Sequence, residues 1–255
     1  MTTTIRIATR RSPLALWQAE YVRGQLLHYH SNLQVELVPL STRGDNAVDT
    51  SLRKIGGKGL FVKELEVALL DLRADIAVHS LKDMPMILPD GLRLGAICKR
   101  ADPSDALVSN SFASLDDLPP GSIIGTSSLR RKCQILAAYP SLVVRDLRGN
   151  VNTRLTKLDK GDYDALILAS AGLERLEMSH RVSDRISSKI ILPAAGQGAV
   201  AIESRTDDPI IESCLKALHH GHSSSCVTAE RALVRVLDGG CRSPMAAFAQ
   251  HDEKN

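Results

Sequence analysis

The fold is decided by a stretch that passes from a short apolar strand through three hydroxyl residues into an arginine-bearing helix, Ile123-Ile124-Gly125-Thr126-Ser127-Ser128-Leu129-Arg130-Arg131. The same order of strand, polar residues and helix occurs near the start of the chain, in Ile5-Arg6-Ile7-Ala8-Thr9-Arg10-Arg11-Ser12. Apolar strands and amphipathic helices alternate around both stretches, with strands expected at 35–40, 75–79, 142–147 and 165–169 and helices at 61–73, 128–139 and 150–160. This alternation predicts an α/β fold with mostly parallel sheets.

Each of the two stretches places polar side chains at the carboxyl end of a strand, so the chain is expected to form two lobes with a ligand cleft between them. The first lobe is assigned residues 1–99 and 199–217, and the second lobe residues 104–193. Chain crossings are expected at 101–104 and at the glycine-containing run 192–198. Residues 221–255, with a helix at 227–237 and a strand at 246–249, are expected to be the remnant of a shortened third domain.

Two predicted helices begin with capping residues, at Ser127 or Ser128 and at Asn150, and both are surrounded by arginines. A helix N-terminus carries partial positive charge, so each arginine there is unfavourable by about 0.3–1 kcal/mol. The arrangement becomes favourable if an anion binds between the arginines and the backbone N–H groups. The sequence therefore predicts a ligand rich in carboxylates or phosphates. The arginines concerned are Arg130, Arg131, Arg148 and Arg154.

Composition indicates a folded protein of ordinary charge. The 255 residues are 44% hydrophobic and 24% charged, and the net charge is only +3. Aromatic residues make up 3%, too few for the stacking surfaces typical of nucleic-acid binding. The start of the chain has no apolar signal segment and no run reaches membrane-spanning length, so we expect a cytoplasmic protein without a membrane partner. Reduced thiols are expected for the five scattered cysteines, Cys98, Cys133, Cys214, Cys226 and Cys241.

A glycine-rich run precedes the helix expected at 61–73, Ile55-Gly56-Gly57-Lys58-Gly59-Leu60-Phe61. A nucleotide-binding P-loop would need the G-x-x-x-x-G-K-[ST] spacing, and Leu60 stands where Mg²⁺ would need a hydroxyl. We therefore interpret the run as a glycine-hinged flap that carries Lys58 and Phe61.

Asp83 ends the run Ala77-Val78-His79-Ser80-Leu81-Lys82-Asp83, directly after a buried strand. The pair Lys82-Asp83 would also suit a surface turn. Because the carboxyl ends of strands are where ligands bind in open α/β sheets, we expect Asp83 to line the cleft. A carboxylate there can accept hydrogen bonds from a substrate that bears N–H groups, and it can transfer protons.

A histidine cluster, His219, His220 and His222, precedes Cys226 and raises the question of a metal site. The segment offers no carboxylate to orient the ligands, and its spacing matches no standard zinc pattern. A solvated linker between domains is therefore expected, with no metal.

Cys241 follows two glycines at the end of a predicted helix, in Asp238-Gly239-Gly240-Cys241-Arg242. Two interpretations remain open from the residues alone. The thiol could be inert in a helix-terminating turn, or it could be presented on a mobile loop and activated by Arg242.

In combination, these runs resemble the porphobilinogen deaminase family, also called hydroxymethylbilane synthases. Each run alone would be weak support, but so many in the same order are specific. The matching runs are Arg6-Ile7-Ala8-Thr9-Arg10 with Ser12-Pro13-Leu14-Ala15, Gly56-Gly57-Lys58-Gly59-Leu60-Phe61, Ala77-Val78-His79-Ser80 with Lys82-Asp83, Gly125-Thr126-Ser127-Ser128-Leu129-Arg130-Arg131, Leu147-Arg148-Gly149-Asn150 with Thr153-Arg154, Pro193-Ala194 with Gly196-Gln197-Gly198-Ala199, and Gly239-Gly240-Cys241.

The resemblance implies a transferase of tetrapyrrole biosynthesis that joins four porphobilinogen units head to tail, releases ammonia at each step and yields hydroxymethylbilane. It implies a dipyrromethane cofactor bound to Cys241 through a thioether. Asp83 and Lys82 would be catalytic, and both would contact the cofactor together with Arg130, Arg131 and Ser128. The substrate-binding residues would be Arg10, Ser12, Lys58, Phe61, Thr126, Ser127, Arg148, Arg154 and Gln197.

The resemblance also implies a monomer with the two-lobed fold of periplasmic binding proteins and a smaller third domain that carries the cysteine. Family members continue well past this cysteine, so the third domain is expected to be incomplete in this chain. The alternative function is therefore a catalytically impaired or non-catalytic protein that binds polycarboxylate pyrroles in the same cleft.

Overall fold

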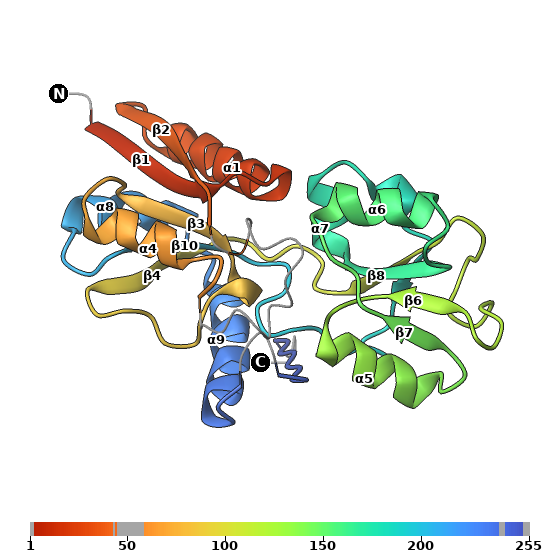
Figure 1. The fold of residues 1–255 in the computed structure, drawn as a ribbon. Coiled ribbons are helices and arrows are strands. Elements are labelled where there is room, and N and C mark those ends of the chain that lie inside the picture. The colour runs from red at the N-terminus through yellow and green to blue at the C-terminus, as the bar shows by residue number, and fades with distance from the viewer. Residues whose placement is uncertain (1–2, 43, 45–58, 240–242, 252–255) are drawn as a thin grey trace. The chain divides into compact units, whose positions relative to one another are not determined.

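The computed structural model of the chain describes residues 3–42, 44, 59–239 and 243–251 (Figure 1). The chain divides into two compact units. Unit 1 consists of Met1–Arg100 with Ala199–Thr228, and unit 2 of Ala101–Gly198 with Ala229–Asp252. The lobe boundaries expected from the sequence, including a separate segment at 221–255, stay a prediction.

The centre of unit 1 is a five-stranded sheet with the order β2-β1-β3-β10-β4. Its strands are β1 (Thr3–Arg10), β2 (Leu33–Leu40), β3 (Ile76–Ser80), β4 (Leu92–Ile97) and β10 (Val200–Arg205). β1 is parallel to β2 and β3, whereas β10 is antiparallel to β3 and β4. β10 takes the opposite direction because the chain returns alongside the segment by which it left, where the Cys98 N–H donates to the Val200 carbonyl at 3.0 Å.

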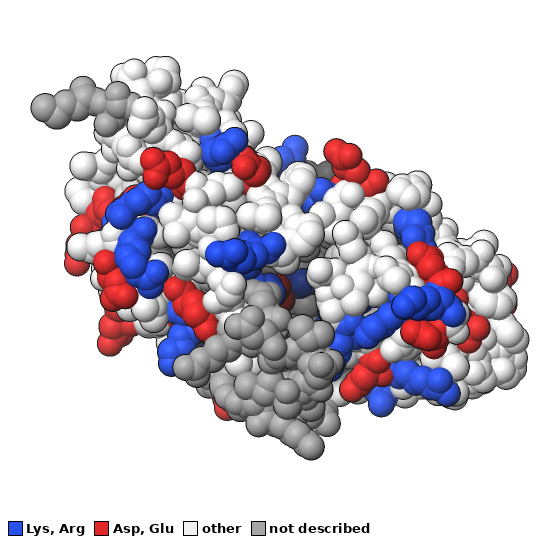
Figure 2. Space-filling model, turned by 45° about the horizontal axis from the view of Figure 1, so that its top comes forward, with Lys and Arg blue, Asp and Glu red and all other residues white. Residues whose placement is uncertain are grey.

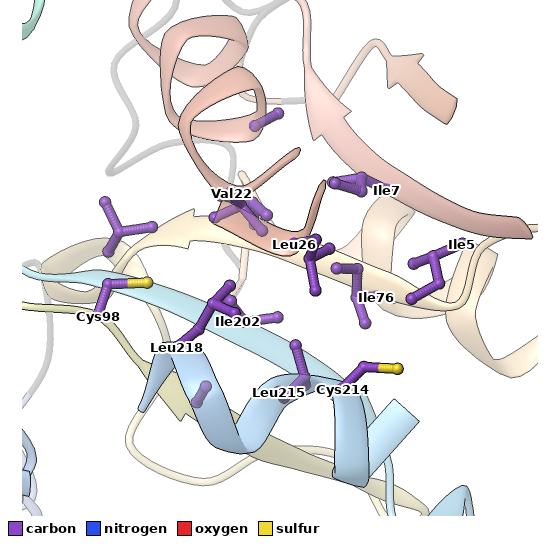
Figure 3. Close-up of a cluster of buried hydrophobic side chains, with 14 of the residues drawn as sticks. Ile5, Ile7, Val22, Leu26, Ile76, Cys98, Ile202, Cys214, Leu215 and Leu218 are labelled. Atoms are coloured by element: carbon purple, nitrogen blue, oxygen red, sulfur yellow. The ribbon is translucent and has the colours of Figure 1, made fainter. Parts of the chain in front are cut away.

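Helices cover both faces of this sheet. On one face, α1 (Pro13–Tyr29) and α8 (Pro209–Leu215) enclose an apolar cluster with strand side chains such as Ile7, Ile76 and Ile202 (Figure 3). On the other face lies α4 (Lys63–Leu70), whose apolar side chains pack against alanines of β1 and β3. The remaining helical elements that begin in this unit are η1 (Leu81–Asp83), η3 (Lys216–Leu218) and α9 (Gly221–Val236).

The first helix begins where its sequence predicts. Ser12 is the N-cap of α1, its side chain accepts from the Ala15 N–H, and Pro13 occupies the first helical position. Proline suits that position because its missing N–H would have no partner inside the helix. This start leaves Arg10 and Ser12 at the carboxyl end of β1.

Unit 2 repeats the same plan around a second five-stranded sheet, ordered β7-β6-β8-β5-β9. The strands are β5 (Asp105–Val108), β6 (Ile123–Gly125), β7 (Val143–Arg145), β8 (Ala165–Ala169) and β9 (Asp184–Ile186). The helical elements are α5 (Leu129–Ala138), α6 (Val151–Asp159), α7 (Ser170–Arg175) and η2 (Ser179–Arg181). β6 is parallel to β7 and β8, whereas β5 is antiparallel to β8 and β9.

The predicted α/β class with mostly parallel sheets is confirmed. Four of the five strands in each sheet point in the same direction, as expected from strand–helix–strand units. The fifth strand, β10 in unit 1 and β5 in unit 2, is antiparallel to both of its neighbours, so each sheet is mixed but mostly parallel. These antiparallel strands adjoin the chain crossings, which carry no connecting helix to reverse the direction of the chain.

Two expectations are wrong. Residues 246–249 form no strand, although their backbone is bonded: the Ala247 N–H donates to the Pro193 carbonyl at 3.1 Å. The histidine segment is not a solvated linker, because α9 begins at Gly221 rather than at 227. His220 caps this helix, with its Nδ1 accepting from the Ser223 N–H at 3.2 Å. Histidine is not one of the usual helix-capping residues, so the sequence contained no standard signal for this start.

Gly198 lies where two segments of unit 2 come close together. Its φ is +87°, and a β-carbon added there would lie 2.6 Å from the Ala101 carbonyl oxygen. A side chain would therefore be strained by its backbone conformation and would also displace backbone atoms. Gly121 has the same φ of +87° but no atom within 4 Å of such a β-carbon.

We expect Gly198→Ala to destabilise the protein by about 2–4 kcal/mol and the matched control Gly121→Ala by only about 1 kcal/mol. Urea unfolding of both variants measures the difference, which isolates the close backbone approach from the positive φ. Equal losses in the two variants would show that the contact with Ala101 is unimportant.

Candidate functional site

Unit 1 contains a pocket at the carboxyl ends of β1 and β3, with about 410 Å³ of empty space including the solvent at its mouth. Four of the predicted site residues line it together: Arg10, Ser12, Phe61 and Asp83. They come from the end of β1, the cap of α1, the approach to α4 and the turn η1 after β3. The remaining lining residues are Leu14, Ala15, Gln18, Val62, Val78, His79 and Ser80.

Arg10 lies across the ring of Phe61, with its guanidinium carbon 4.2 Å from the ring centroid. A cation over an aromatic face is attracted to it, so the ring helps to fix the position of the guanidinium. Phe61 lines the pocket, whereas Lys58 of the same glycine-rich run lies outside the described residues.

The turn that carries Lys82 and Asp83 is anchored by the buried residues on either side of this pair. Leu81 and Met84 are fully buried, and the Leu81 N–H donates to the Ala199 carbonyl at 3.0 Å. Lys82 and Asp83 are half-buried between these two anchors. A carboxylate on such a short, anchored turn has little freedom to move. A group that acts on a bound substrate needs a fixed position of this kind.

Polar residues that the sequence reasoning did not assign also lie at this pocket. Gln18 is buried, and its amide donates to Ser80 Oγ at 2.9 Å. His79 Nε2 lies 2.9 Å from Glu203 Oε2, and both side chains are almost completely enclosed. Glu203 follows the apolar residues Val200, Ala201 and Ile202 in β10, and a carboxylate at this place in a buried strand was the signal that could have identified it.

Glu66 of α4 belongs to the same buried region. Burial raises the pKa of its carboxyl to about 6, and the charge of Glu203 acts in the same direction. His79 opposes this rise. The carboxyl of Glu66 is therefore half protonated at about pH 6, well above the pH at which an exposed glutamate takes up its proton.

In unit 2, the three hydroxyl residues after β6 organise the loop that begins α5. Ser127 Oγ donates to the Leu147 carbonyl at 2.8 Å and accepts from the Leu147 N–H at 3.0 Å, which ties the end of β6 to the segment after β7. Ser128 is the N-cap of α5, and Thr126 Oγ1 accepts from the Ser128 N–H at 3.2 Å. The predicted cap at this helix is thus confirmed as Ser128.

Arg130 and Arg131 of α5 are buried around one carboxylate that the sequence reasoning missed, Asp105 of β5. Arg131 Nη2 lies 2.6 Å from Asp105 Oδ1, and Arg130 Nη1 lies 2.7 Å from Asp105 Oδ2. The side chain of Gln197 donates to the same carboxylate at 2.9 Å. A charged residue at the start of a buried apolar strand was the available signal.

The ion pairs decide the protonation of Asp105. Burial alone would raise the pKa of this carboxyl, but Arg131 and Arg130 more than offset that effect and hold the pKa well below its usual range. Burial lowers the pKa of the Arg130 guanidinium, and Asp105 opposes this change. Two guanidinium groups against one carboxylate leave the group with a net positive charge.

The remaining predicted arginines flank the start of α6. Asn150 caps this helix, as predicted, and its side chain accepts from the Thr153 N–H at 2.9 Å. Arg154 Nε donates to the Gly149 carbonyl at 2.8 Å, and Arg148 is half-buried in the segment between β7 and α6. Unit 2 therefore gathers four arginines and three hydroxyl residues near the carboxyl ends of the parallel strands β6 and β7, where a parallel sheet binds ligands.

Cys241 lies outside the described residues, but the helix end that precedes it is described. Asp238 has a positive φ of 49°, and the Gly239 N–H donates to the Val234 carbonyl at 2.8 Å. These bonds form the helix-terminating turn that the sequence predicts, with aspartate rather than glycine in the left-handed position.

Charge is dispersed on the face of the molecule shown in Figure 2. Figure 2 shows lysine and arginine side chains interspersed with acidic ones on the face that it presents, without one large basic patch. No group of three or more His, Cys, Asp and Glu side chains suited to a metal ion occurs within the described ranges. Within the same ranges, every helix is too short or too polar to span a lipid bilayer.

Two family models match the chain. Residues 5–213 match the model described as "Porphobilinogen deaminase, dipyromethane cofactor binding domain". Residues 224–255 match "Porphobilinogen deaminase, C-terminal domain". The first match alone covers most of the chain, and the second includes Cys241.

Solved structures with a similar fold are bacterial binding proteins. A periplasmic substrate-binding protein of an ABC transporter from Coxiella burnetii has a TM-score of 0.55 at 15% identity, with 94% of this chain and 100% of that chain covered. A putative methionine-binding lipoprotein from Bacillus subtilis has a TM-score of 0.53 at 14% identity, with coverages of 88% and 93%. A nutrient binding protein from Burkholderia cenocepacia bound to methionine has a TM-score of 0.52 at 13% identity, with coverages of 95% and 99%. This likeness confirms the two-lobed α/β fold and carries no information on the ligand.

Proposed function

The chain belongs to the porphobilinogen deaminase family, and on that premise we propose that it joins four porphobilinogen units head to tail, with release of ammonia at each step, to give hydroxymethylbilane. The observation that supports this best is the pocket of unit 1, where Arg10, Ser12 and Asp83 converge at the carboxyl ends of parallel strands. A substrate with two carboxylates and a pyrrole N–H needs both a cation and a carboxylate at its binding site.

Asp83 is the group to which we assign the chemistry. Loss of ammonia from porphobilinogen leaves a methylene-pyrrole cation, and a preorganised carboxylate stabilises such a cation electrostatically. The same carboxylate accepts a hydrogen bond from the pyrrole N–H, which orients the ring. Lys82 in the same turn and Arg10 across the pocket supply positive charge for the acetate and propionate groups.

The residues of unit 2 fit the dipyrromethane cofactor that the family model names. Two linked pyrroles carry four carboxylates, and the buried group of Arg130 and Arg131 around Asp105 retains a net positive charge. We assign these two arginines and Ser128 to the cofactor, with Lys82 and Asp83. Thr126, Ser127, Arg148, Arg154, Gln197, Phe61 and Lys58 are assigned to substrate. When bound, the cofactor supplies the primer to which the first substrate unit is joined.

We further propose that the cofactor is attached to Cys241 through a thioether and that the chain acts as a cytoplasmic monomer. The lobes would be residues 1–99 with 199–217 and residues 104–193, followed by a third segment at 221–255. The His79–Glu203 pair and Asp105 are additions to the site that the sequence reasoning did not contain.

Intact mass of the purified protein tests this function first. We expect a mass excess of two linked pyrroles that is absent in Cys241→Ser. Cys133→Ser is the matched control, because Cys133 is an exposed thiol on α5 and should leave the excess unchanged. Incubation with porphobilinogen should then add further pyrrole units and release ammonia.

The bare polypeptide mass before and after incubation with porphobilinogen would contradict the assignment. Saturable binding of porphobilinogen without ammonia release would instead support the alternative of a non-catalytic binding protein. The two functions are thus separated by one measurement of mass and one of ammonia.

A further inference from the structure

Three ionisable side chains meet behind the pocket of unit 1, on the face of the sheet that α4 covers (Figure 1). His79 of β3 and Glu203 of β10 lie on the same face of two antiparallel strands, with Nε2 and Oε2 2.9 Å apart. Glu66 reaches the same region from α4, and the charges of His79 and Glu203 both act on it. We name these three residues the Glu66–His79–Glu203 cluster.

This cluster is enclosed by apolar side chains. Glu203 is 0% exposed, His79 5% and Glu66 7%. In the sheet, Ala77 is the partner of Glu203 and Ala201 the partner of His79, and Leu65 and Leu69 of the buried apolar face flank Glu66 along α4. Charged groups are rarely buried this deeply without complete pairing, because only interactions with partner groups can offset the free energy lost with hydration.

Pairing in the cluster is incomplete. Glu66 Oε1 and Glu203 Oε1 are buried, and neither has a hydrogen-bond partner among the described residues. A buried carboxylate oxygen without a donor is strongly unfavourable, and protonation of one carboxyl removes the charge that causes the cost. Two carboxylates and one imidazole therefore form a group in which an additional proton is readily accommodated.

The cluster reaches the pocket through His79, which lines it together with Arg10 and Asp83. A hydrogen bond between Glu203 Oε2 and His79 Nε2 sets the orientation of the imidazole. The other charged groups that act on Glu66 are Lys63 and Glu64 of α4. A charge that enters the pocket is thus felt by the cluster at short range and in a medium of low polarity.

We propose that the Glu66–His79–Glu203 cluster is a proton store for the pocket that holds Asp83, with His79 as the member that exchanges the proton. The inference rests on the proposed function. When two porphobilinogen units are joined, the pyrrole α-carbon that forms the new bond loses a proton. The aminomethyl nitrogen gains one proton as its C–N bond breaks, and it leaves as ammonia. The cluster accepts the first proton and returns one for the second, so that its own protonation is unchanged after each turnover.

The first part of the test measures protonation in the cluster directly and does not depend on turnover. The signals of the His79 imidazole are followed by ¹⁵N NMR of the purified protein from pH 5 to 8, and they are assigned by their loss in His79→Gln. We expect these signals to change near pH 6 in the wild type, where the Glu66 carboxyl takes up a proton. This change should be absent in Glu66→Gln and altered in Glu203→Gln. His79 signals that are unchanged over this range in all three proteins would overturn the proposal.

The second arm measures ammonia release as a function of pH in the same variants. We expect kcat of Glu203→Gln to fall by about tenfold or more while KM changes by less than about threefold, with the acid limb of the kcat profile displaced. The matched control is His30→Gln, because His30 is a partly buried histidine of unit 1 whose Nε2 bonds a backbone carbonyl, that of Cys214, at 3.0 Å, rather than a carboxylate.

Other outcomes separate the two proposals. A wild-type protein that releases no ammonia would contradict the proposed function. The NMR measurement would still show whether the Glu66–His79–Glu203 cluster takes up a proton. Unshifted pH profiles in Glu66→Gln and Glu203→Gln, with only a lower thermal midpoint, would mean that the cluster is purely structural and would overturn the inference.

Discussion

Asp83→Asn should reduce ammonia release from porphobilinogen by about 10²–10⁴-fold while leaving the free energy of unfolding nearly unchanged. The amide occupies the same volume but carries no charge, so it cannot stabilise the methylene-pyrrole cation. Stability should be unaffected because Asp83 is only half-buried, and its turn is anchored by the buried Leu81 and Met84. Ammonia release and urea unfolding, measured on the same preparation, give both quantities.

Asp90→Asn provides the matched control for this loss. Asp90 is an exposed aspartate of unit 1 outside the pocket lining, and its substitution should leave turnover within about twofold of the wild type. Near-normal turnover of Asp83→Asn would refute the assignment of Asp83. A loss of turnover accompanied by an equal loss of folded protein would show that the turn depends on the carboxylate for its structure.

Asp105→Asn should destabilise the protein by about 3–5 kcal/mol at pH 7, the largest effect on stability that we expect from a single side chain in unit 2. The variant leaves Arg130 and Arg131 buried next to each other without the carboxylate that now lies 2.7 and 2.6 Å from them. Their charges then repel in a region that excludes water. Urea unfolding at neutral pH measures the loss.

The difference in unfolding free energy between the wild type and Asp105→Asn should depend on pH, because the pKa of Asp105 is lowered in the folded protein. A carboxyl whose pKa is lower in the folded state contributes stability that is fully present above its unfolded pKa, about 3.9. As the pH falls below that value, the contribution should decrease by about 1.4 kcal/mol per pH unit. The stability gap between the wild type and Asp105→Asn should therefore narrow below about pH 4, and a constant gap would contradict the ion-pair explanation.

Asp159→Asn is the matched control for burial. Asp159 also pairs with an arginine at short distance, 2.6 Å from Arg181 Nη2, but this pair is at the surface. Surface ion pairs contribute little because water already solvates both charges, so the expected loss is about 0–1 kcal/mol. A loss similar to that of Asp105→Asn would mean that distance rather than burial determines the strength of these pairs.

Local signals in the sequence were sufficient for most helix starts and for part of the site. Ser12-Pro13, Ser128 and Asn150 begin helices because their side chains satisfy backbone donors within a few residues. Asp83 could be placed at the end of a strand because an apolar run immediately precedes it. The start of α9 could not be predicted in this way, because the residue that caps it is a histidine.

The sequence by itself determined the α/β class, the family and the positions of Arg10, Ser12 and Asp83 at strand ends, since all of these depend on neighbours close in the chain. Only the tertiary structure decided which distant charges meet. Asp105 lies 25 or more residues from Arg130 and Arg131 in the chain, and Glu203 lies more than 120 residues from His79. Their partners are selected by strand order and by burial in a medium of low polarity, which no local pattern encodes.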